Sequence, residues 1–165
     1  MTMVELGMVI LVLGIVMALT MPRFGGVFER YETRRTVNVV RGTVRYLHAQ
    51  AAFKKRIFYL VFDLERQSMA VCSKAQEQDS ACIREYGREL REYVFPAGVH
   101  ILDIVDPLGQ KISEGEAVTR FFPVGIADPS IIHLGTDSGR KITLTIEPLS
   151  GRVKDWDGYL DPRSG

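Results

Sequence analysis

The chain is apolar from Leu6 to Met21. Glu5, directly before this run, is the only ionisable side chain before Arg23. In a helix, this run reaches only ~24 Å, which is less than the ~30 Å hydrocarbon core of a bilayer. A spanning helix must therefore draw Glu5 into or near the bilayer, where a central acidic residue costs roughly 3 kcal/mol. The sequence predicts a transmembrane helix over residues 1–22 whose carboxylate is compensated by a partner.

Two other interpretations of this segment stay open. A secretory signal peptide carries a basic region before its apolar core, yet no Lys or Arg precedes the run. A plain single-pass anchor predicts no charge at the fifth position.

Gly14 and Ala18 form a pair of small residues that lets another helix approach closely. Pro22 lacks an amide donor and predicts a kink where the helix leaves the membrane.

The whole chain has 46% apolar and 25% charged residues, which is ordinary for a globular protein, and the residues behind this segment suffice for one domain. The net charge of +1 argues against a dedicated nucleic-acid binder over the whole chain. The small net charge conceals an asymmetry, because the segment from Arg23 to Arg56 has nine basic residues and only two acidic ones, Glu29 and Glu32. The basic residues are Arg23, Arg30, Arg34, Arg35, Arg41, Arg45, Lys54, Lys55 and Arg56.

The basic segment, residues 23–56, is predicted to be an amphipathic continuation of the first helix. Its apolar residues recur at steps of three and four, which makes a stripe that can lie on a sheet. They are Val37, Val40, Val44, Leu47 and Ala51. The charged side chains take the opposite face.

From Ile57 onward, short β-rich runs separated by turn residues indicate a β-rich head over residues 57–165. In the last run, Ile142, Leu144 and Ile146 alternate with polar residues, which is typical of a half-buried antiparallel strand. The predicted strands are Ile57–Leu64, Ser68–Cys72, Val99–Val105, Val118–Phe122, Ile131–Leu134 and Lys141–Glu147. The fold class is α+β, with the long helix packed on an antiparallel sheet or sandwich.

The start of the chain resembles the N-terminus of mature type IV pilins and pseudopilins, a superfamily with a Phe-Thr-Leu-Val-Glu-Leu type of start. The matching positions are Thr2, Val4, Glu5, Leu6, Gly14 and Pro22, while Met1 stands where Phe is usual. The resemblance implies that a prepilin peptidase removes a short basic leader before Met1 and that the new amine is methylated. It also implies that Glu5 pairs with the N-terminal amine of a neighbouring subunit, and that the protein has a lollipop shape.

The C-terminal half resembles the head of the GspH and FimT class of minor pseudopilins and minor pilins. The matching stretches are Phe121–Gly125, Ile131–Leu134 and Arg140–Val153. In that class, a Phe-x-Pro-x-Gly turn precedes two strands and the last strand ends in a Pro-x-x-Gly-Arg-Val turn.

The resemblance implies a GspH-like minor pseudopilin, a structural subunit of the type II secretion pseudopilus. Its expected partners are other pseudopilins or pilins of the same filament, an inner-membrane assembly platform and the lipid of the inner membrane. The head is expected in the periplasm, on a single-pass anchor, and no cofactor is expected.

An alternative function is that of a FimT- or FimU-like minor pilin that holds DNA for uptake. Phosphate contacts need clustered cations, and binding would weaken steeply with salt. The candidates near the Gly-Arg turn are Arg140, Lys141, Arg152 and Lys154. The acidic residues that dilute their field are Glu147, Asp155, Asp157 and Asp161.

Cys72 and Cys82 are the only cysteines, and the implied orientation of the anchor places them outside the cytoplasm. A disulfide between them would close a short loop and contribute about 2 to 3 kcal/mol on the chain-entropy model. The alternative is two unpaired, small hydrophobic side chains. Without nearby His ligands, the pair makes a poor zinc site.

Enzyme motifs are not found in the sequence: it has no phosphate-binding Gly-Lys-Ser/Thr loop and no Gly-x-Ser-x-Gly elbow. His48, His100 and His133 are isolated and are expected to be structural. Asp155, Asp157 and Asp161 suggest calcium, because hard cations prefer clustered oxygens. They miss the spacing of an EF-hand loop, and the stretch from Asp155 to Gly158 also resembles an ordinary turn. No metal site and no catalytic residue are therefore predicted.

Overall fold

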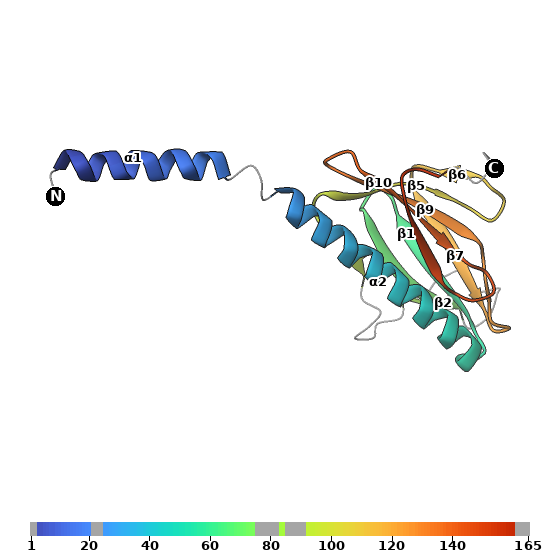
Figure 1. Ribbon diagram of the computed structural model, residues 1–165. Coiled ribbons are helices and arrows are strands. Elements are labelled where there is room, and N and C mark those ends of the chain that lie inside the picture. The colour runs from blue at the N-terminus through green and yellow to red at the C-terminus, as the bar shows by residue number, and fades with distance from the viewer. Residues whose placement is uncertain (1–2, 21–24, 75–82, 85–91, 161–165) are drawn as a thin grey trace.

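The computed structural model describes residues 3–20, 25–74, 83–84 and 92–160. Helix α1 runs from Met3 to Thr20 and extends away from the head in Figure 1. Within the described ranges, no helix is long and apolar enough to cross a membrane. Helix α1 covers residues 3–20 of the range predicted as a transmembrane helix, 1–22, and its place in a membrane stays a prediction. Met1 and Pro22 lie outside the described residues.

Helix α2, Gly25–Lys54, packs on the head along the stripe that the sequence predicts. Val40, Val44, Leu47 and Ala51 are fully buried, and Val37 is 7% exposed. The helix contacts strands of both sheets, and it lies across them in Figure 1. An amphipathic helix is present over residues 25–54 of the predicted range 23–56. That it continues the first helix stays a prediction, because residues 21–24 lie outside the described residues.

The first sheet lies under α2 and has β1 at its centre, with strand order β3-β2-β1-β7-β8 and with β4 also paired to β2. Its strands are β1 (Ile57–Asp63), β2 (Ser68–Lys74), β3 (Ile83–Arg84), β4 (Tyr93–Val94), β7 (Glu116–Phe122) and β8 (Ile126–Ala127). All of its pairings are antiparallel. The sequence predicts a strand over Ile57–Leu64, and β1 lies at the centre of this sheet and buries every second residue.

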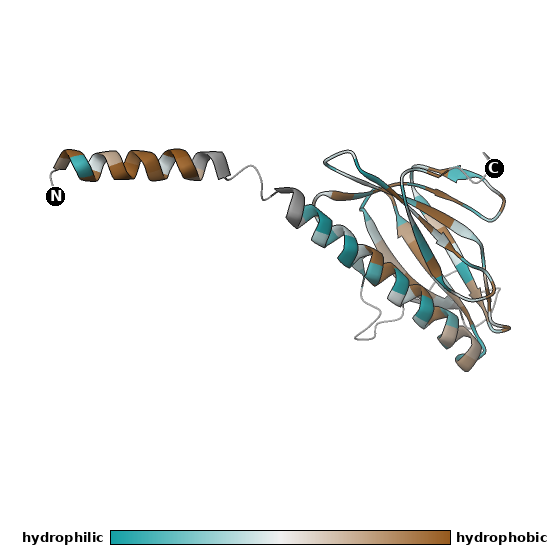
Figure 2. Ribbon diagram, in the orientation of Figure 1, coloured by the Kyte–Doolittle hydropathy of each residue, from teal (hydrophilic) through white to brown (hydrophobic). Residues whose placement is uncertain are grey.

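The second sheet is also antiparallel and has strand order β11-β10-β9-β5-β6. Its strands are β5 (Val99–Val105), β6 (Lys111–Ile112), β9 (Ser130–Thr136), β10 (Lys141–Ile146) and β11 (Val153–Asp157). One hydrophobic cluster joins α2 and both sheets, and Phe58, Phe62 and Phe121 are its largest buried side chains. In Figure 2, α1 is mostly brown, whereas α2 shows both teal and brown bands along its length, as expected of an amphipathic helix. The predicted α+β fold class is confirmed, and the head, expected to be an antiparallel sheet or sandwich, contains two antiparallel sheets.

The structure corrects the interpretation of the stretch from Asp155 to Gly158 as a turn. Strand β11 continues through Asp157, and only Gly158 lies in a bend with positive φ. Val153 is the only buried residue of β11, so the strand has no apolar alternation that a sequence pattern could detect. Pairing with β10 holds this polar strand in place, as is common at sheet edges.

Candidate assembly surface

Helix α1 presents an apolar surface on all of its sides. Every side chain from Met3 to Met17 is exposed, including Leu11 at 62% and Met17 at 72%. Glu5 lies in the first turn, where the partial positive charge of the helix N-terminus favours a carboxylate. A Cβ added at Gly14 would meet nothing within 4 Å, so the surface there is open to a second helix. The side chain of Ala18 lies outside the described residues.

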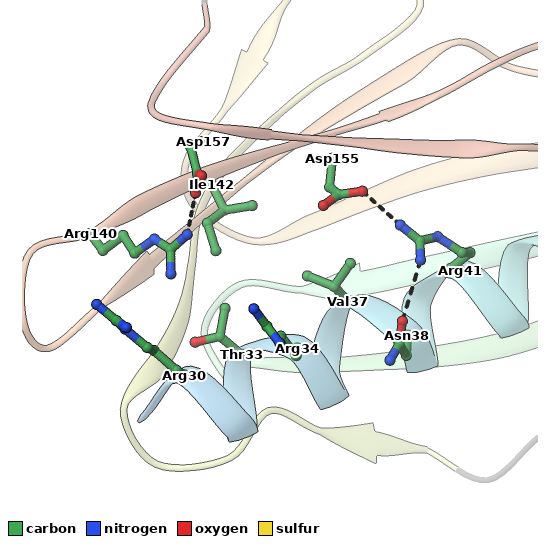
Figure 3. Close-up of a pocket in the computed structure, with 10 residues that line it drawn as sticks. All are labelled: Arg30, Thr33, Arg34, Val37, Asn38, Arg41, Arg140, Ile142, Asp155 and Asp157. Atoms are coloured by element: carbon green, nitrogen blue, oxygen red, sulfur yellow. Dashed lines mark hydrogen bonds and ion pairs between the residues drawn. The ribbon is translucent and has the colours of Figure 1, made fainter. Parts of the chain in front are cut away.

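A groove lies between α2 and the ends of β10 and β11, with a volume of about 370 Å³. Figure 3 shows Arg30 and Arg34 extending from α2 toward the strands. Across the groove, Arg41 on α2 donates to Asp155 on β11 at 2.7 Å, and within the helix it donates to Asn38 at 3.3 Å. Arg140 pairs with Asp157 on the side of the strands. The groove therefore has a cationic wall on the helix, one ion pair that crosses it and one ion pair on the strands.

A second hollow of about 550 Å³ adjoins the first at Arg41, which lines both hollows. Its other arginines are Arg45 on α2 and Arg152 on the turn before β11. At its far end, α2 approaches the head closely. A Cβ on Gly151 would come within 2.5 Å of the His48 ring, and the His48 Nε2 lies 3.0 Å from the carbonyl oxygen of Gly125.

The other end of α2 is tied to the β9–β10 turn by a hydrogen bond from the Ser138 hydroxyl to the Glu29 carboxylate. The pKa of Glu29 is lowered from its ordinary value, mainly because of this hydrogen bond. Contacts at Glu29 and Arg41 thus fix α2 against the second sheet, and the groove lies between them, while His48 binds the β7–β8 turn of the first sheet. The sequence predicted the basic face of α2 but not this groove.

Three of the four predicted DNA-binding cations already have interactions within the head. Arg140 pairs with Asp157, and Lys154 pairs with Glu147, whose pKa it lowers. The Lys141 Nζ lies 5.5 Å from the centroid of the Tyr159 ring. Arg152 lines the second hollow. DNA binding by these residues stays a prediction.

The aspartates that suggested calcium are engaged in ion pairs. Asp155 pairs with Arg41 and Asp157 with Arg140, while Asp161 lies outside the described residues. In the part of the chain that the structure describes, no three His, Cys, Asp or Glu side chains gather at a distance suited to a metal ion. Cys72 is buried on β2, and Cys82 lies outside the described residues, so their pairing stays a prediction.

A buried polar network on the outer face of the second sheet was not predicted. Asp103 on β5 and His133 on β9 are 3% and 0% exposed, and their side chains lie 2.6 Å apart. The Nε2 of His133 donates to the carbonyl oxygen of Leu160 at 2.9 Å, and the Tyr159 ring stacks on the imidazole with centroids 3.9 Å apart.

Lys111 completes this network at the protein surface. Its ammonium donates to the Tyr159 hydroxyl at 2.6 Å and lies 3.2 Å from the Asp103 carboxylate, and these two contacts raise the pKa of Lys111. The network holds residues 159–160 over the second sheet. The expectation that His133 is structural agrees with this placement.

A long N-terminal helical region packed on an antiparallel β head defines a pilin-like fold. Comparison with known proteins agrees with this assignment at the level of structure. No protein-family model matches the chain, and no curated protein sequence matches it.

Two solved structures that match are both of the minor pseudopilin EpsH from the type 2 secretion system of Vibrio cholerae. One has a TM-score of 0.62 at 9% identity and covers 79% of this chain and 99% of the EpsH chain. The other has a TM-score of 0.61 at 11% identity and covers 79% and 97%. At this identity the comparison shows the fold alone, and the chain has the fold of the minor pseudopilin EpsH.

Proposed function

We propose that this protein is a minor pseudopilin, a structural subunit of the type II secretion pseudopilus that supports protein export. The observation that carries the proposal is a contrast between two parts of the chain. The head has the EpsH fold and buries its own core, whereas the described side chains of α1 are exposed. A helix that is apolar all round is stable when other helices or lipid cover it. Neighbouring subunits of a filament supply that cover.

Before assembly, α1 lies in the inner membrane and the head in the periplasm, and an assembly platform in that membrane moves the subunit into the filament. In the filament, α1 packs in a bundle with the corresponding helices of other pseudopilins. The open surface beside Gly14 supports close packing of such helices.

Glu5 has a specific role in this assembly. A carboxylate surrounded by apolar helices is costly unless a cation compensates it. The methylated amine at Met1 of a neighbouring subunit supplies that cation, which sets the axial position of one subunit relative to the next. The protein is therefore a structural component rather than an enzyme.

The test compares Glu5→Gln with Glu65→Gln, a control that removes one carboxylate from the exposed turn after β1. Both variants are produced as full chains together with the other pseudopilins of the same system. We expect Glu5→Gln to leave the thermal unfolding of the head unchanged while lowering incorporation into sedimented filaments and slowing export. The control should behave like the wild type. Wild-type incorporation and export by Glu5→Gln would show that the pairing role is wrong.

The alternative, DNA uptake, predicts a different result with the same protein. A salt-sensitive mobility shift of duplex DNA by the full chain in detergent, weakened by Arg152→Ala, would favour it. For a pseudopilin we expect no shift that depends on Arg152.

A further inference from the structure

The groove between α2 and β11 is more cationic than the rest of the chain. Its two hollows are lined by six arginines and two aspartates, which gives a local charge of +4 against +1 for the whole chain. The arginines are Arg30, Arg34, Arg41, Arg45, Arg140 and Arg152. A concentration of one sign of charge at a hollow favours a ligand of the opposite sign.

Three of these arginines follow one edge of α2 and are available to a ligand. Arg41 and Arg140 are neutralised by Asp155 and Asp157, whereas no carboxylate among the described residues pairs with Arg30, Arg34 or Arg45.

The spacing of Arg30 and Arg34 suits an extended chain. They are separated by ~6 Å along the helix axis, and Arg45 lies ~16 Å beyond Arg34. A strand places every second side chain ~6.6 Å apart on one face, so two alternate side chains of an extended ligand match Arg30 and Arg34, while Arg45 lies outside this match.

Strand β11 offers backbone groups beside these arginines. It is an edge strand, paired with β10 alone among the described strands. The carbonyl of Arg152 accepts from Glu147 on the β10 side, and the amide of Gly158 donates to Lys141 on the same side. Because strand residues alternate, the backbone groups of Val153, Asp155 and Asp157 face the open edge. An open edge is a template for an added strand.

We propose that this groove binds an extended acidic segment of a co-assembled subunit, which adds to the edge of β11 and places two alternate carboxylates on Arg30 and Arg34. This proposal rests on the proposed function and names the kind of partner that the head takes. A ligand with a continuous phosphate backbone fits less well, because it has no backbone N–H groups to pair with the open edge of β11.

The probe is a fluorescent peptide of alternating Glu and Thr, and binding to the full chain in detergent micelles is followed by fluorescence anisotropy. We expect the double variant Arg30→Glu, Arg34→Glu to bind about tenfold more weakly, because two attractions become repulsions. The matched control, Lys55→Glu with Arg56→Glu, makes the same change of charge at the exposed end of α2 and should bind like the wild type. Thermal unfolding of each variant checks that the head stays folded.

Three further probes test the strand and the acidic side chains separately. We expect weaker binding when Gln replaces Glu in the peptide, and also when alternate amides are N-methylated and cannot donate to β11. Inorganic polyphosphate should compete poorly.

Equal weakening by both double variants would overturn the proposal, as would full binding of the N-methylated peptide or strong competition by polyphosphate. Peptide binding by the head does not require Glu5. Glu5→Gln therefore separates the two ideas: failure of peptide binding leaves the assembly role of α1 standing, and failure of the assembly test leaves the groove intact.

Discussion

The apolar side chains of the two helices differ in what covers them. In α2, the apolar residues form one stripe, and the sheets of the same chain cover that stripe completely at Val40, Val44 and Leu47. In α1, apolar residues point in every direction, and all described side chains from Met3 to Met17 are exposed. The comparison teaches that folding of the head and burial of α1 are separate events, the second of which needs other molecules.

This separation predicts that equivalent truncations in the two helices have different consequences. Leu47→Ala removes a fully buried side chain and should destabilise the head by about 2 to 5 kcal/mol. Leu11→Ala removes a side chain that is 62% exposed and should leave the stability of the head unchanged while reducing filament incorporation. Urea unfolding followed by Trp156 fluorescence, together with filament sedimentation, measures both effects. Similar losses of head stability in the two variants would mean that α1 belongs to the core.

The close approach of α2 to the turn before β11 gives a second, smaller expected effect. Gly151 has φ +60°, and an added Cβ would meet the His48 side chain at 2.5 Å. Gly151→Ala should therefore destabilise the head by about 1 to 3 kcal/mol, through backbone strain and displacement of His48.

Gly139→Ala is the matched control for this substitution. Gly139 has φ +83° and open space around its Cα, so its replacement adds backbone strain without a clash. The difference in unfolding free energy between the two variants measures how tightly α2 is held. If the two variants lose equal stability, the contact between His48 and Gly151 does not fix the helix.

The smallest expected effect concerns the N-terminal end of α2 and depends on pH. The hydrogen bond from Ser138 lowers the pKa of Glu29 below its ordinary value of 4.5, so the ionised carboxylate stabilises the folded head above that value. This contribution is lost as the pH falls through the lowered pKa. The melting temperature of the wild type should therefore fall more on acidification than that of Glu29→Gln. Parallel pH profiles would show that the contact adds nothing to stability.

Local patterns in the sequence predicted most of the fold. The stripe from Val37 to Ala51 depends on helix periodicity, and Val99–Val105 is a strand in both the prediction and the structure. Strand β11 was missed because its stability comes from pairing with β10 rather than from an apolar pattern.

The buried Asp103 could not be predicted, because a bulge between Ile101 and Asp103 shifts the alternation of β5. Asp103 and Ile104 are consequently both buried, which a strict two-residue period does not allow. The groove was also missed, because the Arg41–Asp155 pair that crosses it joins residues 114 positions apart. The exposed Glu5, in contrast, was found from its position in an apolar run, although its role stays a proposal.

The network around His133 has a practical consequence for labelling this protein. Residues Tyr159 and Leu160 shield the imidazole and the Asp103 carboxylate from water, and the amide of Leu160 donates to the Thr143 hydroxyl. A fluorescent reporter that replaces the residues after Gly158 would remove that shield. The His133 imidazole and the Asp103 carboxylate would then be exposed to water. Joined beyond Leu160, the same reporter would leave the shield in place and would not loosen the head.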